Sequence, residues 1–182
     1  KNNFLKILGI IFFIVSLFSI YKIRINPQDS YWFLLLITVI CISTDIGGYI
    51  FGKIFKGPKL TKISPKKTYS GVIGSFILSI VGSLIFIEYF DGLKTYIYIN
   101  HISFEPYGIN LNLFILLFIL ISSLISQLGD LIVSYFKRIA KIKDTGKILP
   151  GHGGLLDRID GMIFAFPLSY LLLLFDHSYL LI

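Results

Sequence analysis

The sequence predicts an all-α, polytopic integral membrane protein with about five transmembrane helices in this chain. Of its 182 residues, 55% are hydrophobic, and a mean hydropathy of +0.81 is too high for a soluble domain of this size. The net charge is +7, but the cations gather in two segments, which indicates membrane orientation and not nucleic-acid binding. Five apolar segments alternate with polar ones: residues 4–21, 31–51, 70–90, 112–133 and 161–175.

The first two apolar segments are each long enough to cross a bilayer. No small-residue cleavage site follows the first, so it is not expected to be a signal peptide. The second begins with the interfacial aromatic pair Tyr31 and Trp32. Small and polar residues then recur on one face at helical spacing. An acid inside a membrane helix is a functional candidate, and a hydrogen bond to a neighbouring helix is the alternative. The face consists of Cys41, Thr44, Asp45, Gly48 and Gly52.

The third and fourth segments carry small or polar stripes with different expected roles. Glycine and serine recur every four residues in the third segment, which predicts close helix packing. The stripe on the fourth segment is confined to its second half and ends at an acid, so it is expected to face a cavity or another helix. The first stripe is Gly71, Ser75, Ser79 and Ser83, and the second is Ser122, Ser126, Asp130 and Ser134, with Gln127 beside it.

The two charged segments are predicted to lie on the cytoplasmic side. Residues 53–69 contain six lysines and no acid, whereas residues 91–110 have almost no net charge and are expected outside. Residues 134–160 mix both signs of charge around the run Pro150–Gly154, which no regular helix would carry. Cations and exposed N–H groups suit a polyphosphate, and carboxylates suit the Mg²⁺ that accompanies one. A basic loop that only fixes topology is the alternative for each segment.

The second charged segment resembles the signature of a known enzyme family, the phosphatidate cytidylyltransferases or CDP-diacylglycerol synthases. An upstream part of the same family is similar, more loosely, to two further stretches: Asp45-Ile46-Gly47-Gly48-Tyr49 and Ser64-Pro65-Lys66-Lys67-Thr68. Family members often have Thr-Gly-Ala after the Asp, where this chain has Ile46-Gly47-Gly48. The resemblance covers roughly residues 44–182 of a single membrane-embedded domain, 1–182. Because the family usually carries further helices upstream, this chain is expected to lack some of them. The matching signature is Ser134, Lys137-Arg138, Lys143-Asp144, Gly146, Pro150, His152-Gly153-Gly154, Asp157-Arg158 and Asp160.

The resemblance implies a reaction in which CTP and phosphatidate give CDP-diacylglycerol and pyrophosphate. It implies Mg²⁺, with a second cation as an option, held by Asp130 and Asp157. The expected partners are CTP, phosphatidate in the bilayer and, as an option, a second copy in a homodimer. The expected location is the cell (inner) membrane with the active site facing the cytoplasm. The expected catalytic residues are Lys143, Asp144, Asp157 and Asp160, and the expected substrate-binding residues are Ser64, Lys66, Lys67, Lys137, Arg138, His152, Gly153, Gly154 and Arg158.

Three other functions remain open at the level of sequence. A CTP-dependent polyprenol kinase would release CDP instead of pyrophosphate, and the same cytidylyl transfer onto an ether lipid would use the same site. An ion-coupled transporter would use Asp45 and Asp130 as an ion path and need no CTP. Transport leaves the glycine-histidine run unexplained.

Overall fold

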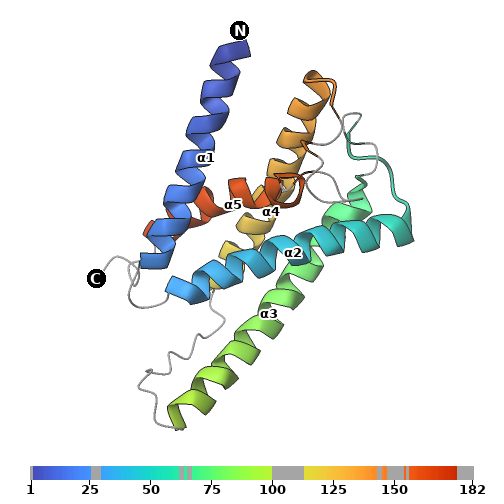
Figure 1. Ribbon diagram of the computed structural model, residues 1–182. Helices are drawn as coiled ribbons and strands as arrows, with labels where there is room; N and C mark the ends of the chain where they lie inside the picture. The colour runs from blue at the N-terminus through green and yellow to red at the C-terminus, as the bar shows by residue number, and fades with distance from the viewer. Residues whose placement is uncertain are drawn as a thin grey trace.

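The computed structural model consists of helices joined by short connections (Figure 1). It describes residues 2–25, 30–61, 64, 67–99, 113–142, 145–146, 154 and 156–175, with the backbone alone for residues 2–8, 30, 91–99 and 158. These ranges contain no strand, only an isolated antiparallel bridge between Lys59 and Thr68. The predicted all-α class is confirmed. The helices are α1 (Asn2–Ile25), α2 (Ser30–Phe55), α3 (Tyr69–Ile99), α4 (Leu113–Ile139) and α5 (Leu156–Leu174).

Within the described residues, three helical segments are long and apolar enough to cross a membrane: Tyr31–Phe55, Tyr69–Phe90 and Leu113–Ile139. A span needs about 20 apolar residues, so each reaches across the hydrocarbon core. The apolar part of α5, Ile159–Leu174, is shorter. The chain is therefore a membrane protein, as predicted, with a helix at each of the five expected places.

Several predicted boundaries between helix and loop are wrong. Helices α1 and α2 each run four residues past their predicted ends at residues 21 and 51. Helix α3 continues to Ile99, so residues 91–99 are helical and not loop. Helix α4 runs six residues past residue 133, and α5 begins five residues before residue 161. Hydropathy marks where the apolar surface ends, but a helix continues until a strong breaker occurs. A single glycine such as Gly92 costs only about 1 kcal/mol and does not end a helix.

Helix α4 ends in a Schellman motif that was not predicted from the sequence. Lys141 adopts a positive φ of 54°. Its N–H donates to the carbonyl of Arg138, and the N–H of Ile142 donates to the carbonyl of Lys137, both at 3.0 Å. Glycine normally fills this left-handed position. The motif turns the chain sharply beside the charged end of α4.

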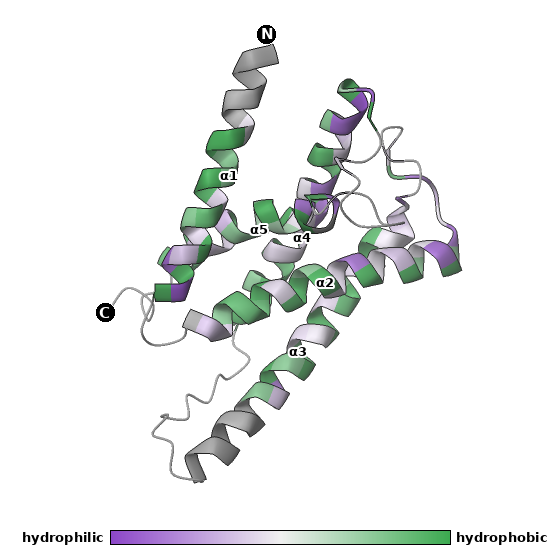
Figure 2. Cartoon of the chain, viewed as in Figure 1, coloured by the Kyte–Doolittle hydropathy of each residue, from purple (hydrophilic) through white to green (hydrophobic). Residues whose placement is uncertain are grey.

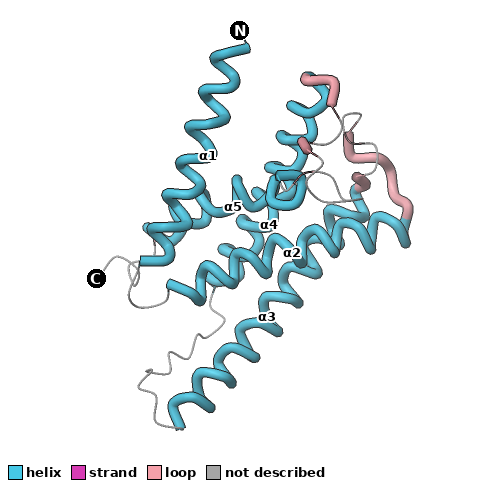
Figure 3. The backbone as a smooth tube through the Cα atoms, viewed as in Figure 1, coloured by secondary structure: helices cyan, strands magenta, loops and turns pink. Residues whose placement is uncertain are grey.

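The helices pack around an apolar core at one end and gather their polar residues at the other. Figure 2 shows polar colouring at the C-terminal parts of α2 and α4, and Figure 3 shows the described loops on that same side. The core joins α2, α4 and α5 through buried apolar side chains. They include Trp32, Leu36, Ile37, Ile40, Phe118, Ile119, Ala165 and Leu173.

Helices α2 and α3 form the most extensive helix pair of the fold. A Cβ on Gly47 would lie 2.5 Å from the carbonyl oxygen of Gly74, and a Cβ on Gly71 would lie 2.8 Å from that of Gly48. Ser75 Oγ donates a hydrogen bond of 2.7 Å to the carbonyl of Thr44. The predicted packing role of the stripe on the third segment is thus confirmed, and it brings the C-terminal half of α2 against the start of α3.

Gly74→Ala is expected to destabilise the protein, whereas Gly9→Ala is not. A Cβ at Gly74 would lie 2.3 Å from Cβ and Cγ of Phe51, while nothing lies within 4 Å of one at Gly9. Overpacking costs about 1–3 kcal/mol, whereas glycine to alanine in an open helix gains up to about 1 kcal/mol. Thermal unfolding in detergent micelles measures both variants. An equal midpoint in the two variants would contradict the close approach of α2 and α3.

Candidate active site

A cavity of about 380 Å³ lies where the polar ends of α2 and α4 meet the starts of α3 and α5. Four carboxylates from three helices reach it, although they are far apart in sequence. One lysine from the α2–α3 connection and a serine from the same segment reach it as well. The charged and predicted residues of its lining are Asp45, Asp130, Asp157, Asp160, Lys67 and Ser64.

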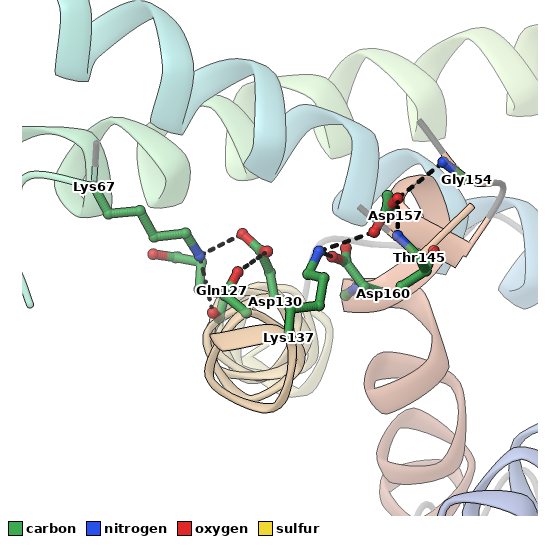
Figure 4. Close-up of polar contacts among 10 residues, drawn as sticks. Lys67, Gln127, Asp130, Lys137, Thr145, Gly154, Asp157 and Asp160 are labelled. Carbon is green, nitrogen blue, oxygen red and sulfur yellow. Dashed lines mark hydrogen bonds and ion pairs between the residues drawn. The ribbon is translucent and has the colours of Figure 1, made fainter. Parts of the chain in front are cut away.

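Lys67 and Asp130 form the first ion pair of the cavity (Figure 4). Lys67 Nζ lies 2.5 Å from Asp130 Oδ2 and donates to the carbonyl oxygen of Gln127 at 3.3 Å. Ser134 Oγ donates a longer hydrogen bond, 3.4 Å, to Asp130 Oδ1. Both charged side chains keep more than a quarter of their surface accessible. The pair therefore joins the α2–α3 connection to α4 while remaining open to the cavity.

Lys137 forms the second ion-paired group, beside the first (Figure 4). Its Nζ lies 3.0 Å from Asp157 Oδ1 and 3.6 Å from Asp160 Oδ2. All three side chains are largely buried, at 11–13% exposure. One ammonium thus offsets two carboxylates that would otherwise repel each other. This group fastens the C-terminal turn of α4 to the first turn of α5.

Asp157 also organises the backbone that precedes α5. Its Oδ2 accepts hydrogen bonds from the N–H groups of Thr145 and Gly154, each at 2.9 Å. A Cβ on Gly154 would lie 2.5 Å from Thr145 Oγ1 and 2.7 Å from the nitrogen of Gly146, so only glycine fits there. The predicted Gly154 therefore lies beside the acid, and its N–H contacts a carboxylate.

These contacts lower the pKa of Asp157, which precedes the apolar part of α5. Burial alone would raise that pKa from 3.8, but the two backbone N–H donors and the Lys137 ammonium favour the charged form and bring it to about 2. With this pKa, the Asp157 carboxyl group is ionised at neutral pH.

The lowered pKa predicts a stability change in acid. A depressed pKa stabilises the fold fully above the unfolded value of 3.8, and this contribution is lost as the pH falls towards 2. The thermal midpoint of the wild type is expected to fall between pH 5 and pH 2.5, and Asp157→Asn should remove part of that fall. An equal fall in wild type and variant would show that Asp157 is not held as described.

The structure brings some of the predicted site residues together and separates one. Asp130, Asp157, Asp160, Lys67 and Ser64 line one cavity, while Lys137 holds two of those acids. Arg138 is exposed and is not among the lining residues. Several other predicted residues lie outside the described part of the chain, so the structure leaves them as predictions. They are Lys66, Lys143, Asp144, His152, Gly153 and the side chain of Arg158.

The cavity also includes residues for which only a packing role, or no role, was predicted. Gly71 and Ser75 pack against α2 and also line the cavity, because the face of α3 that packs on α2 continues into the cavity wall. Gln127 lines the cavity one turn before Asp130, and its buried Nε2 has no hydrogen-bond partner among the described residues. The available signal was the position of Gln127 beside the polar stripe, three residues before Asp130.

The donor set suits a hard divalent cation such as Mg²⁺, because carboxylate oxygens are its preferred ligands. In the described ranges, no three or more His, Cys, Asp or Glu side chains are gathered closely enough to hold a metal by themselves. Mg²⁺ typically takes one or two carboxylates and completes its shell with water and phosphates. The Lys67 ammonium already pairs with the Asp130 carboxylate, so this carboxylate binds a positive charge inside the cavity. Asp130 and Asp157 both line the cavity, and their pairing as metal ligands stays a prediction.

Comparison with known proteins gives the family. Residues 2–176 match the model described as Cytidylyltransferase family. A phosphatidate cytidylyltransferase of Staphylococcus haemolyticus is 38% identical over 149 residues, which are 81% of this chain and 51% of that protein. The corresponding Staphylococcus aureus protein is 43% identical over 133 residues, 72% of this chain and 45% of its own. A phosphatidate cytidylyltransferase of Rickettsia conorii is 38% identical over 143 residues, which are 78% of this chain and 57% of that protein.

The chain spans about half the length of these curated relatives. The family match nevertheless covers nearly all of the chain, including every helix around the cavity. The resemblance inferred from residues 134–160 is thus confirmed, and the chain belongs to the cytidylyltransferase family.

Proposed function

We propose that the protein transfers the cytidylyl group of CTP to phosphatidate, giving CDP-diacylglycerol and pyrophosphate for phospholipid synthesis. The observation that carries the proposal is the cavity itself. Four carboxylates and Lys67 meet at the polar end of an otherwise apolar helix bundle, in a chain whose relatives are named phosphatidate cytidylyltransferases. A site at this boundary can receive a water-soluble nucleotide from one side and a lipid phosphate from the bilayer.

The reaction joins an oxygen of the lipid phosphate to the α-phosphorus of CTP and breaks the bond between that phosphorus and the oxygen bridging to the β-phosphorus. Pyrophosphate leaves with the electron pair of the broken bond. A phosphate monoester has a second pKa of about 6, so the lipid nucleophile is already largely ionised. No carboxylate has to act as a general base, which leaves Asp45, Asp130 and Asp160 free for charge and orientation.

The residues of the cavity take complementary roles in this proposal. Asp130 and Asp157 would hold Mg²⁺, which would supply positive charge against the triphosphate and the departing pyrophosphate. Lys67 contacts phosphate oxygens, as predicted from the sequence. Lys137 is a positioning residue, because its ammonium is committed to Asp157 and Asp160. The second cation and the homodimer remain predictions.

The acceptor lipid tests the proposal. Purified protein is incubated with Mg²⁺, CTP labelled in either the α- or the γ-phosphate, and vesicles that contain phosphatidate, a polyprenol or neither. Only the α-label is expected in the lipid extract, and only with phosphatidate. Ether-linked phosphatidate in a fourth sample distinguishes the ether-lipid variant of the reaction. Absence of lipid-borne label in every sample would overturn the proposal.

We further propose the inner membrane as the location, with the cavity facing the cytoplasm, because the lysine-rich segment 53–69 joins α2 to α3 at the cavity. Cysteines placed at Lys59 or Lys141, both exposed, should resist an impermeant thiol reagent applied to intact cells and react after the cells are opened. The native Cys41 is buried and serves as the unlabelled background. Labelling in intact cells would reverse the orientation.

A further inference from the structure

We propose that Lys67 exchanges partners when substrates bind: its ammonium holds Asp130 in the ligand-free protein and passes to the nucleotide phosphates when a divalent cation takes that carboxylate. This inference rests on the proposed function and adds to it a coupling between the binding of metal and nucleotide. Lys67 would thereby favour the joint binding of metal and nucleotide over the binding of the metal alone.

The geometry puts the ammonium where a cation ligand of Asp130 belongs. Lys67 Nζ lies 2.5 Å from Asp130 Oδ2, and both residues line the cavity. The second contact of the ammonium, the carbonyl of Gln127 at 3.3 Å, is an uncharged acceptor. Among the described residues, one charged contact and one neutral contact therefore hold Lys67 in this position.

The side chain can move without its backbone. The N–H of Lys67 donates to the carbonyl of Ser64 at 3.0 Å, and its own carbonyl accepts from the N–H of Leu60 at 2.8 Å. The neighbouring Thr68 pairs with Lys59 in the antiparallel bridge. The lysine side chain is a flexible four-carbon stem with a single charged tip, and 26% of it is exposed. Its ammonium can thus turn from Asp130 into the cavity while the segment stays in place.

Lys137 provides the contrast within the same site. It contacts two carboxylates instead of one, is 13% exposed and does not line the cavity. Displacing it would leave both acids without their cation. Of the two lysines paired with the cavity acids in the described structure, Lys67 is the one suited to exchange.

The exchange predicts cooperative binding. A metal ion alone must displace the ammonium from Asp130, its one ion-paired carboxylate among the described residues. When a nucleotide is present, the metal receives the carboxylate and Lys67 receives phosphate oxygens, so both cations stay paired. Such coupling is reciprocal: the factor by which nucleotide strengthens metal binding equals the factor by which metal strengthens nucleotide binding.

Two binding measurements on the purified protein test the exchange. Mn²⁺ affinity without nucleotide is read from the electron paramagnetic resonance of free Mn²⁺. The affinity for a CTP analogue with a methylene bridge between the α- and β-phosphorus is measured by calorimetry in EDTA and in saturating Mn²⁺. Lys67→Met removes the ammonium, and Lys67→Gln replaces it in the test if the methionine variant does not purify. Lys59→Met, an exposed lysine of the same segment, is the matched control.

In Lys67→Met, Mn²⁺ without nucleotide is expected to bind at least threefold more tightly than in the wild type, because no ammonium competes for Asp130. The enhancement of analogue binding by Mn²⁺ is expected to fall at least fivefold. Lys59→Met should match the wild type in both. Unchanged or weaker Mn²⁺ binding in Lys67→Met would overturn the exchange, and so would an unchanged enhancement.

Failure of the exchange is distinguishable from failure of the proposed function. If the wild type forms lipid-linked cytidine nucleotide and Lys67→Met fails the binding test, only the exchange is overturned. If the wild type forms no such product, the proposed reaction is overturned whatever the binding data show.

Discussion

Asp130→Asn is expected to abolish formation of lipid-linked cytidine nucleotide while the protein still inserts and purifies. Asparagine keeps the shape of the side chain but removes the charge that a divalent cation and Lys67 both use. Removing one preorganised electrostatic contact to a transition state typically costs roughly 10²–10³ in turnover. The stability change is expected to be small, about 0–1 kcal/mol, because the pair with Lys67 is partly exposed. Initial rates with labelled CTP and phosphatidate measure the loss.

Glu88→Gln is the matched control, since it makes the same change from carboxylate to amide on an exposed part of α3. It should retain wild-type rates. Asp157→Asn is expected to lose activity as well, and also to loosen the contacts with Thr145 and Gly154. Near-normal turnover of Asp130→Asn in Mg²⁺ would show that Asp130 is not a metal ligand. It would not contradict the family of the chain.

Lys137→Met is expected to have the largest effect on stability. It would leave Asp157 and Asp160, both largely buried, without the ammonium that separates their charges. Removing one partner of a buried ion pair typically costs about 3–5 kcal/mol, because the remaining charge is uncompensated. Thermal unfolding in detergent micelles measures the loss, together with protease susceptibility of the connection between α4 and α5.

Arg138→Met is the control for this variant. It removes a cation from the next position of the same helix, where the side chain is exposed, and should change the unfolding midpoint little. Similar stability of the two variants would contradict the role of Lys137 as the residue that fastens α4 to α5.

The sequence predicted the helices and the acids of the site because both follow from local patterns. Five apolar segments gave five helices, and the polar stripe on α4 meets α5 at Ser122 and reaches the cavity at Asp130. Helix ends were less predictable, because hydropathy does not report where a backbone stops being helical. The left-handed turn at Lys141 occurs without a glycine, so no local signal marked the end of α4.

The pairing of charges could not be predicted from the sequence. Lys67 and Lys137 were both expected to contact substrate phosphates, yet they differ in burial and in partners. Which lysine meets which acid depends on distances between segments up to 63 positions apart, as for Lys67 and Asp130. Gly71 and Ser75 show the same limit, since a packing face and a cavity wall have identical small-residue patterns.

The phosphorus atom that reaches the lipid tests the proposed reaction most directly. Two samples of CTP, one labelled at the α-phosphorus and one at the γ-phosphorus, are incubated with the protein, Mg²⁺ and phosphatidate vesicles. Cytidylyl transfer predicts α-label in the lipid extract and γ-label in released pyrophosphate. Appearance of γ-label in the lipid, with CDP left in the aqueous phase, would contradict it.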